Sequence, residues 1–208
     1  MTEVVRPYRG VSAEERRGQR RSQLLEACLD VVAEVGVADT TAEGVCARAG
    51  LSKRYFYESF ADREAILVAI LDDLFDRVSI AIAELIEGGE ALPEDERVRR
   101  TVTVLVRELS VDLRAARVYV EAPRHPTLEQ RRLRAFDDFA RLLLAEHVLN
   151  VEADDRRAYP VALMIVAGTT EVMARWLSGE LALSEDEVVD VISGVGLAAG
   201  AFVRGGRP

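Results

Sequence analysis

The chain has 208 residues, of which 49% are hydrophobic and only 6% aromatic. This length allows one compact body with a smaller appendage, and the abundance of Ala, Val, Leu, Arg and Glu favours helices over sheets. The formal net charge of −9 argues at first sight against nucleic-acid binding, because basic groups must neutralise phosphates. Residues 1–60, however, carry nine basic and nine acidic side chains, so the acidity belongs to the later part.

Cys28 and Cys46 have no ligand partners nearby in the sequence, and His125 and His147 lie far from both. We therefore expect reduced cysteines, no metal and no cofactor. The N-terminus shows no signal-peptide pattern, and apolar runs such as 161–168 are too short to span a bilayer. These features predict a cytoplasmic chain that does not contact a membrane.

The first eleven residues lack hydrophobic periodicity and contain Arg6 and Arg9. They predict a mobile basic arm, whose arginines either reach a DNA minor groove or are simply solvated. A first helix should begin at Ser12, because Ser12 and Glu15 have the spacing of a capping box. Its apolar stripe predicts a helix that ends at Gly36.

Two short helices are predicted next. A capping-box pattern over Thr40–Glu43 opens the first, which ends at Gly50, and Ser52 begins a second that ends near Phe60. Gly50 supplies the left-handed turn conformation that other residues resist, so the spacing is that of a helix-turn-helix. Cys46 lies where the two helices should approach closely, which favours packing over redox chemistry.

A long helix capped by Asp62 should run to about residue 87, with Gly88 and Gly89 ending it. Pro93 then starts a fifth helix, and a capping-box pattern over Thr127–Gln130 starts a later one. The remaining helices are expected over residues 114–122, 127–150, 154–179 and 184–203. Pro160 either kinks its helix or marks the helix start, and both alternatives stay open.

The predicted fold is thus all-α, with about nine helices. We divide the chain into an arm (1–11), a helix-turn-helix domain (12–61) and a helical bundle for ligand binding and dimerisation (62–208).

The second short helix carries the candidate DNA-reading chemistry. Ser52, Lys53, Arg54 and Tyr55 stand at or near its start, where basic and hydrogen-bonding groups suit a major groove.

The run from Leu24 to Leu67 resembles the TetR family of repressors. LLEACLDVVAEVG is similar to the family's first helix, TTAEGVCARAGLS to its second helix and turn, and KRYFYESFADREAIL to its recognition helix and the start of helix 4. GTTEVMARWLSGE near the C-terminus is similar, more loosely, to the family's dimerisation end. The resemblance implies a homodimer that binds operator DNA and releases it when a small ligand shifts helix 4.

Carried over by position, Thr41, Ser52, Tyr57 and Arg63 resemble phosphate-contacting positions of the family, and Lys53, Arg54 and Tyr55 resemble its base-reading or backbone-reading positions. Two positions depart from the family pattern: Gly44 weakens a helix interior, and Glu58 places an anion where it would repel phosphate. Glu58 either points aside or pairs with a basic neighbour such as Arg54.

Candidate ligand contacts are polar, aromatic or sulfur-containing residues on otherwise apolar helix faces. They are Tyr119, Phe136, Phe139, His147, Met164, Thr169, Glu171 and Met173. Each is individually more typical of a packed core than of a ligand site. Glu171 either faces inward, where it needs a cationic partner, or faces outward as an i,i+4 pair with Arg175, which we favour.

Candidate dimer contacts combine small and apolar side chains near the C-terminus. They are Gly168, Trp176, Val191, Val195, Ala198, Ala199 and Phe202. A final helix this apolar has little reason to lie exposed on a monomer, although packing within one chain is the alternative.

The sequence therefore indicates a ligand-released repressor. A helical enzyme is the first rival, but the chain shows no phosphate loop, nucleophile elbow or metal-binding cluster, so no enzyme is expected. The second rival is a ligand-binding or protein-interaction module without operator binding, favoured only by Glu58 and the acidic balance.

Overall fold

The computed structural model describes residues 12–87, 92–152 and 154–205. Within these ranges the chain forms nine α-helices, one 3-10 turn and no strand, which confirms the predicted all-α class. The basic arm over residues 1–11 and the predicted helix end at Gly88 and Gly89 lie outside the described residues.

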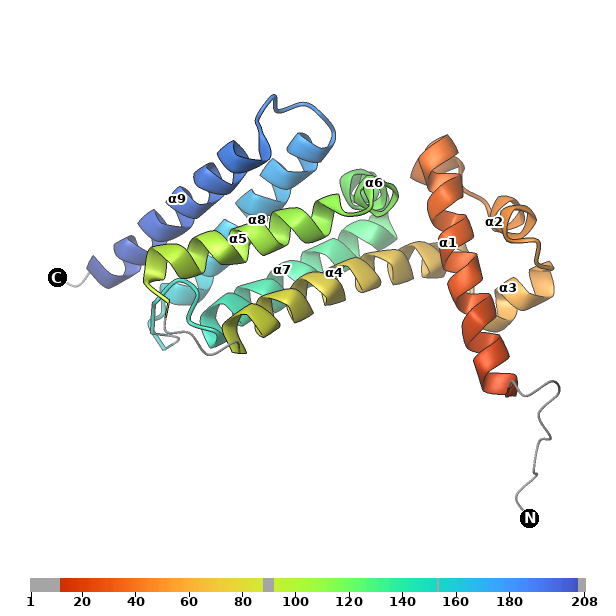
Figure 1. Ribbon diagram of the computed structural model, residues 1–208, viewed down its shortest axis with the longest axis horizontal. Coiled ribbons are helices and arrows are strands. Elements are labelled where there is room, and N and C mark those ends of the chain that lie inside the picture. The colour runs from red at the N-terminus through yellow and green to blue at the C-terminus, as the bar shows by residue number, and fades with distance from the viewer. Residues whose placement is uncertain (1–11, 88–91, 153, 206–208) are drawn as a thin grey trace, which may run out of the picture. The chain divides into compact units, whose positions relative to one another are not determined.

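Figure 1 shows the helices in chain order. Their bounds are α1 (Ala13–Asp39), α2 (Ala42–Ala49), α3 (Lys53–Ser59), α4 (Arg63–Glu87), α5 (Glu94–Ser110), α6 (Leu113–Glu121), η1 (Ala122–Arg124), α7 (Pro126–Ala145), α8 (Ala158–Leu177) and α9 (Glu185–Gly205). The chain divides into two compact units, Met1–Ile70 and Leu71–Pro208. The functional boundary after residue 61 stays a prediction, because α4 is one helix with residues in both units.

The first unit is held together by a small apolar core between α1, α2 and α3, which all pack on one another. Leu24, Val32, Val45 and Phe56 are fully buried. These residues come from three different helices, so the core fixes the short helices α2 and α3 against the long α1.

The N-terminal cap of α1 is the one predicted. The Ser12 hydroxyl accepts from the Glu15 backbone N–H at 3.0 Å, and the Glu15 carboxylate accepts from the Ser12 backbone N–H at 2.5 Å. These backbone and hydroxyl bonds favour the anion and lower the pKa of Glu15. At the other end, regular helix breaks at Gly36, whose φ of 84° is left-handed, before a last turn reaches Asp39.

The capping box predicted over Thr40–Glu43 is wrong. Thr41 alone caps α2, accepting from the Gly44 backbone N–H at 3.0 Å, while the Thr40 hydroxyl donates to the Gly36 carbonyl at 2.7 Å. The Glu43 carboxylate pairs instead with Lys53. A Cβ at position 44 would come within 3.2 Å of the Thr41 hydroxyl oxygen, so glycine suits this tight cap.

Of two further predicted caps, one is confirmed and one is wrong. Asp62 caps α4 as expected, its carboxylate accepting from the Ala65 backbone N–H at 2.7 Å. The capping box predicted over Thr127–Gln130 is wrong, because α7 already begins at Pro126, whose fixed φ and missing N–H suit a first turn.

Pro160, like Pro126, lies in the first turn of a helix. It is the third residue of α8, so it lies in the first turn and marks the helix start rather than a kink. The preceding helix, α7, ends at Ala145, five residues before the predicted end. His147 and Asn150 both have a φ of 50°, so the chain turns here instead of continuing as helix.

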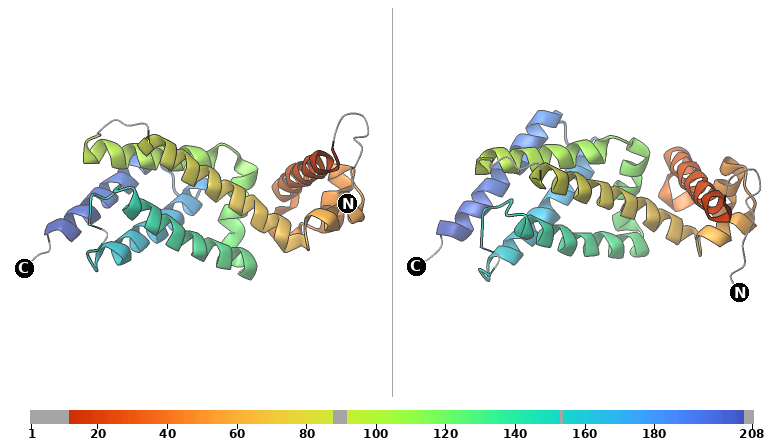
Figure 2. Two further views of the ribbon diagram at one scale, coloured as in Figure 1. Left: turned by 90° about the horizontal axis from the view of Figure 1, so that it is seen from below. Right: turned by 60° about the horizontal axis from the view of Figure 1, so that its bottom comes forward.

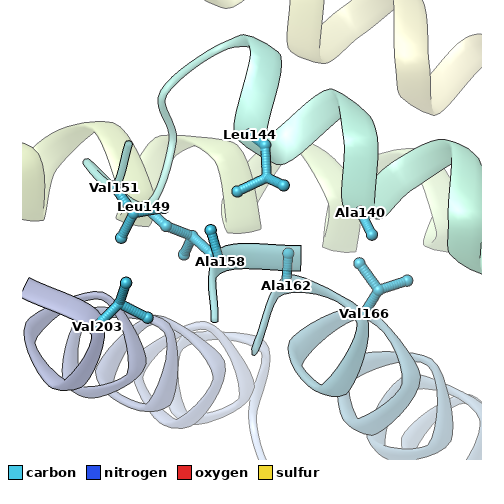
Figure 3. Close-up of a cluster of buried hydrophobic side chains, with 8 residues drawn as sticks. All are labelled: Ala140, Leu144, Leu149, Val151, Ala158, Ala162, Val166 and Val203. Carbon is cyan, nitrogen blue, oxygen red and sulfur yellow. The ribbon is translucent and has the colours of Figure 1, made fainter. Parts of the chain in front are cut away.

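The second unit packs α7 on α8, α5 on α9, and α6 on both α5 and α8. Figure 2 shows these helices from two further sides. Figure 3 shows one buried apolar cluster, in which α7, α8, α9 and the segment after α7 meet. Its members are Ala140, Leu144, Leu149, Val151, Ala158, Ala162, Val166 and Val203. Small residues in this cluster allow close helix approach.

Candidate nucleic-acid interface and ligand cavity

The turn between α2 and α3 is built around Gly50. Gly50 has a φ of 65°, and its N–H and that of Leu51 donate to the Ala47 and Cys46 carbonyls at 3.3 and 3.0 Å. The Gln23 side chain of α1 donates to the Ala49 carbonyl at 2.8 Å. These bonds satisfy the free carbonyls at the end of α2 and hold α3 in a helix-turn-helix arrangement.

The predicted DNA-contacting residues of α3 lie on its exposed side. Lys53 and Arg54 begin the helix and are exposed, and the side chains of Tyr55 and Tyr57 are 38% and 56% exposed. Ser52 stands at the N-cap position without a side-chain cap bond, so its hydroxyl can meet another acceptor or donor. Basic, phenolic and hydroxyl groups are thus presented together, as phosphate and base-edge recognition requires.

Both cationic side chains of α3 form ion pairs with carboxylates of the first unit. Lys53 pairs with Glu43, which raises the pKa of Lys53 and lowers that of Glu43. Arg54 donates through Nε to a Glu58 carboxylate oxygen at 2.9 Å. The Glu58 anion therefore pairs with Arg54, as one of the two sequence-based alternatives predicted.

Arg20 of α1 joins this cluster, and the sequence analysis missed it. Its guanidinium lies 3.9 Å from the Glu58 carboxylate and 4.5 Å from the centre of the Tyr55 ring. Arg20 is more than thirty positions from these partners in the chain, so no local pattern could have connected them.

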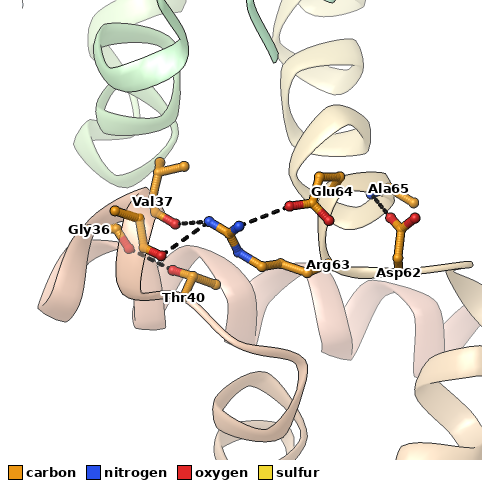
Figure 4. Close-up of polar contacts among 8 residues, drawn as sticks. Gly36, Val37, Thr40, Asp62, Arg63, Glu64 and Ala65 are labelled. Carbon is orange, nitrogen blue, oxygen red and sulfur yellow. Dashed lines mark hydrogen bonds and ion pairs between the residues drawn. The ribbon is translucent and has the colours of Figure 1, made fainter. Parts of the chain in front are cut away.

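Arg63 has a different environment, shown in Figure 4. Its guanidinium donates to the carbonyls of Val37 and Ala38 and to Glu64. These bonds join the start of α4 to the end of α1. The predicted phosphate contact of Arg63 stays a prediction, and it would require this guanidinium to serve DNA and the α1 carbonyls together.

Both cysteines are buried and free. Burial raises the pKa of the Cys28 thiol to about 12 and also raises that of Cys46. Protonated thiols are poor nucleophiles and poor metal ligands, so both residues act as small apolar side chains. Among the described residues, no group of three His, Cys, Asp or Glu side chains is placed to hold a metal ion.

The second unit contains a cavity with about 90 Å³ of room for the centres of water molecules. Helices α4 to α9 all contribute to its lining, which is mainly apolar and aromatic. The lining residues with rings or polar groups are Phe75, Thr101, Tyr119, Arg132, Phe136, Phe139, Thr169 and Thr170.

Four of the eight predicted ligand contacts line this cavity: Tyr119, Phe136, Phe139 and Thr169. The other four lie elsewhere. Met173 is fully buried in the core, Met164 is 74% exposed, and His147 is exposed in the turn after α7. Glu171 is exposed and accepts from Arg175 Nε at 2.6 Å, which confirms the outward i,i+4 pair.

Arg132 is the cavity residue that the sequence analysis missed. It belongs to a run of arginines near the start of α7, yet its side chain is only 12% exposed. Helical periodicity alone could not distinguish Arg132 from the exposed Arg134, because both stand close together near the start of α7.

The predicted dimer contacts of α9 form an apolar exposed face. Val191, Val195 and Phe202 are 49%, 56% and 63% exposed, and Ala198 is exposed beside them. Ala199 and Trp176 are half-buried and Gly168 on α8 is exposed. Trp176 also donates its indole N–H to the Leu183 carbonyl at 2.8 Å, which ties the loop after α8 to that helix.

Two described helices, α8 and α9, are long and apolar enough to cross a membrane by length and composition. Scattered Ala, Gly and Val keep the mean hydropathy high over many residues even though no single apolar run is long. These properties are weak support for a membrane span, because core helices of soluble proteins share them.

Comparison with known proteins identifies the first unit. Residues 24–70 match the family "Bacterial regulatory proteins, tetR family". The matched segment contains the end of α1, the whole of α2 and α3 and the start of α4, so it coincides with the helix-turn-helix described above.

The match to curated relatives is longer than the family match. Over 86 residues, the chain is 30% identical to the HTH-type transcriptional regulators BetI of Klebsiella pneumoniae (strain 342) and Escherichia coli O127:H6. The alignment covers 41% of this chain and 43% of each relative, less than half of either.

Solved structures match nearly the whole fold. The regulator FadR from Bacillus subtilis, in complex with stearoyl-CoA, aligns with a TM-score of 0.70 and 18% identity over 86% of this chain and 98% of its own. FadR from Bacillus halodurans gives 0.67 and 17% over 86% and 94%. A TetR-like regulator from Rhodococcus sp. RHA1 gives 0.65 and 20% over 90% and 97%. At these identities the likeness concerns the fold alone.

Proposed function

We propose that this chain is a DNA-binding transcriptional regulator of the TetR family that acts as a repressor in the cytoplasm. The observation that carries the proposal is the exposed side of α3, where Lys53, Arg54 and Tyr55 stand together just after the Gly50 turn. Such groups at the start of a recognition helix suit the donors and acceptors of a major groove. An acidic chain can bind DNA because charge near the contact surface matters more than the sum.

Charge reversal of Lys53 and Arg54 tests this proposal. We expect the double variant Lys53→Glu, Arg54→Glu to lose binding to a selected operator duplex by about a hundredfold or more, with a flatter salt dependence. Fluorescence anisotropy over a salt series measures both quantities. The matched control is Arg107→Glu, Arg134→Glu, which makes the same charge change on exposed positions of the second unit. Equal operator affinities of the wild type and the α3 variant would contradict the proposal.

We further infer that the cavity of the second unit is an effector site. Its lining includes Phe75 of α4, and α4 also contains residues of the DNA-binding unit. A ligand that prefers one position of α4 changes DNA affinity by linkage. The FadR–stearoyl-CoA complex supports this inference, because a protein of similar fold binds a small molecule.

We also propose a homodimer through the exposed apolar face of α8 and α9, the face that contains Gly168, Val191, Val195, Ala198 and Phe202. Large apolar side chains on a small-residue background favour close helix packing between copies. A dimer also presents two recognition helices to successive major grooves.

The dimer is tested by the variant Val195→Glu, Phe202→Glu. We expect its mass in light scattering to fall to that of one chain, while the control Val111→Glu, at a position 67% exposed at the end of α5, leaves the mass unchanged. A dimeric double variant would contradict this interface.

A further inference from the structure

Two of the hydroxyl groups that line the cavity, those of Tyr119 and Thr101, are used within the protein. The Tyr119 hydroxyl donates to the Thr170 carbonyl at 2.9 Å, and the Thr101 hydroxyl donates to the Arg97 carbonyl at 2.9 Å. Full burial raises the pKa of Tyr119, so its hydroxyl stays neutral. Neither hydroxyl therefore has a donor hydrogen left for an anionic ligand.

Arg132 is the one residue with a formal charge among those that line the cavity within the described ranges. Its Nε and Nη2 donate to the two Glu129 carboxylate oxygens at 2.6 and 2.8 Å, and its guanidinium lies 5.0 Å from the centre of the Phe136 ring. This bidentate pair cancels the charge of Arg132 before any ligand arrives.

Two other pairs of charges also cancel. Arg131, whose guanidinium lies 5.2 Å from the centre of the lining Phe75 ring, pairs with Asp72. Glu171 acts electrostatically on both Arg132 and Tyr119, but it is itself paired with Arg175 at 2.6 Å. Arg132, Glu129, Glu171 and Arg175 sum to zero. An ion in the cavity would lose its water and find no unpaired opposite charge, which is costly in an apolar site.

The rest of the cavity lining favours a ligand with mainly apolar surface. Phe75 meets Tyr119 and Phe139 edge to face, with ring centres 6.4 and 5.9 Å apart. Aliphatic side chains of α4, α5, α7, α8 and α9 complete the lining. Such a lining gains stability by removing apolar surface of a ligand from water.

We propose that this cavity selects an uncharged, mainly apolar ligand, and that Glu129 is the positioning residue that enforces this choice by neutralising Arg132. A ligand carbonyl or hydroxyl oxygen can still accept from Arg132 Nη1, which the bidentate pair with Glu129 does not use. The proposal rests on the proposed effector role of the cavity, but binding is measured on the protein without DNA.

Three probes of equal chain length test the charge preference: dodecanol, dodecanoate and dodecylammonium, each titrated into the purified full chain by calorimetry at neutral pH. We expect dodecanol to bind and both ions to bind at least about tenfold more weakly. Either ion binding as tightly as the alcohol, or binding by none of the three, overturns the proposal.

Two variants then test the role of Glu129. Glu129→Gln should leave dodecanol affinity within about twofold and raise dodecanoate affinity about tenfold, because Arg132 loses its counter-charge. Arg132→Met should instead favour dodecylammonium, because Glu129 is then unpaired. Glu96→Gln, which breaks the exposed pair with Arg100 on α5, is the matched control and should change no probe.

If Glu129→Gln does not fold, two results still test the proposal. They are the order of the three probe affinities in the wild-type chain and the gain of dodecylammonium affinity in Arg132→Met. A dodecanoate affinity that stays constant in Glu129→Gln contradicts the role of Glu129. Loss of the operator-binding proposal would leave these ligand affinities unchanged, so the two failures are distinguishable.

Discussion

The first unit exposes its proposed DNA-contacting side chains on a short helix, whereas the second encloses the proposed effector cavity between longer helices. In the first, Lys53 and Arg54 are exposed and paired with carboxylates at the surface. In the second, Arg132, the one charged residue of the cavity lining within the described ranges, is nearly buried and paired with Glu129. The two proposed functions, binding of a charged polymer and binding of a small apolar molecule, require opposite degrees of side-chain burial.

The largest expected effect concerns the small core of the first unit. Phe56 is fully buried and contacts Tyr57 and Phe60 edge-on or tilted. Phe56→Ala should lower the free energy of unfolding by about 3–5 kcal/mol, because a large cavity opens where few residues can fill it.

Urea unfolding followed by circular dichroism measures this loss. Tyr57→Ala, at the neighbouring 56% exposed position, is the control and should cost less than about 1 kcal/mol. Similar losses in both variants would mean that α3 is not held by its buried face.

The second prediction concerns close packing in the second unit. A Cβ at Gly200 would lie 2.6 Å from the Leu149 carbonyl oxygen, so Gly200→Ala must move backbone and should cost about 1–3 kcal/mol. Gly18→Ala in α1 meets nothing within 4 Å and should instead stabilise the chain by about 0.5–1 kcal/mol. Thermal unfolding of both variants measures these opposite signs, and a stabilised Gly200→Ala would contradict the tight approach.

The third prediction concerns pH. The pKa of Cys28 is about 12 in the folded chain, above the ordinary 9.0. The unfolded chain therefore loses this proton first, and the stability from Cys28 is complete below pH 9 and lost between pH 9 and about 12. Over the first pH unit above 9 the loss should be about 1 kcal/mol. The variant Cys28→Val should reduce this pH slope in urea unfolding, and equal slopes would show that Cys28 does not titrate in this way.

The smallest expected effect concerns Glu58, the anion beside the exposed cations of the first unit. Glu58→Gln removes an anion beside Arg54 and Arg20, and we expect operator affinity to rise about threefold, since exposed ion pairs are weak. Glu34→Gln, which removes one of the two carboxylate partners of Arg48, is the control with the same change in net charge. An equal rise in both variants, measured by anisotropy, would assign the effect to net charge rather than to Glu58.

Local sequence signals determined much of the first unit. The Ser12 cap, the left-handed Gly50 and the Asp62 cap depend on neighbours within four residues, so their spacing alone places the helix ends. The same local signals misplaced the caps at Thr40 and Thr127, where a long-range partner and a proline at the first helical position prevailed.

Helix periodicity in the second unit predicted which segments are helical, but only the tertiary structure decided which faces meet. Met164, a predicted ligand contact, is exposed, whereas Arg132, which was not predicted, lines the cavity. Arg20 likewise reaches Glu58 and Tyr55 only through folding. Caps depend on residues a few positions apart, whereas cavities and charge clusters depend on side chains brought together from distant helices, and that information is absent from any single segment.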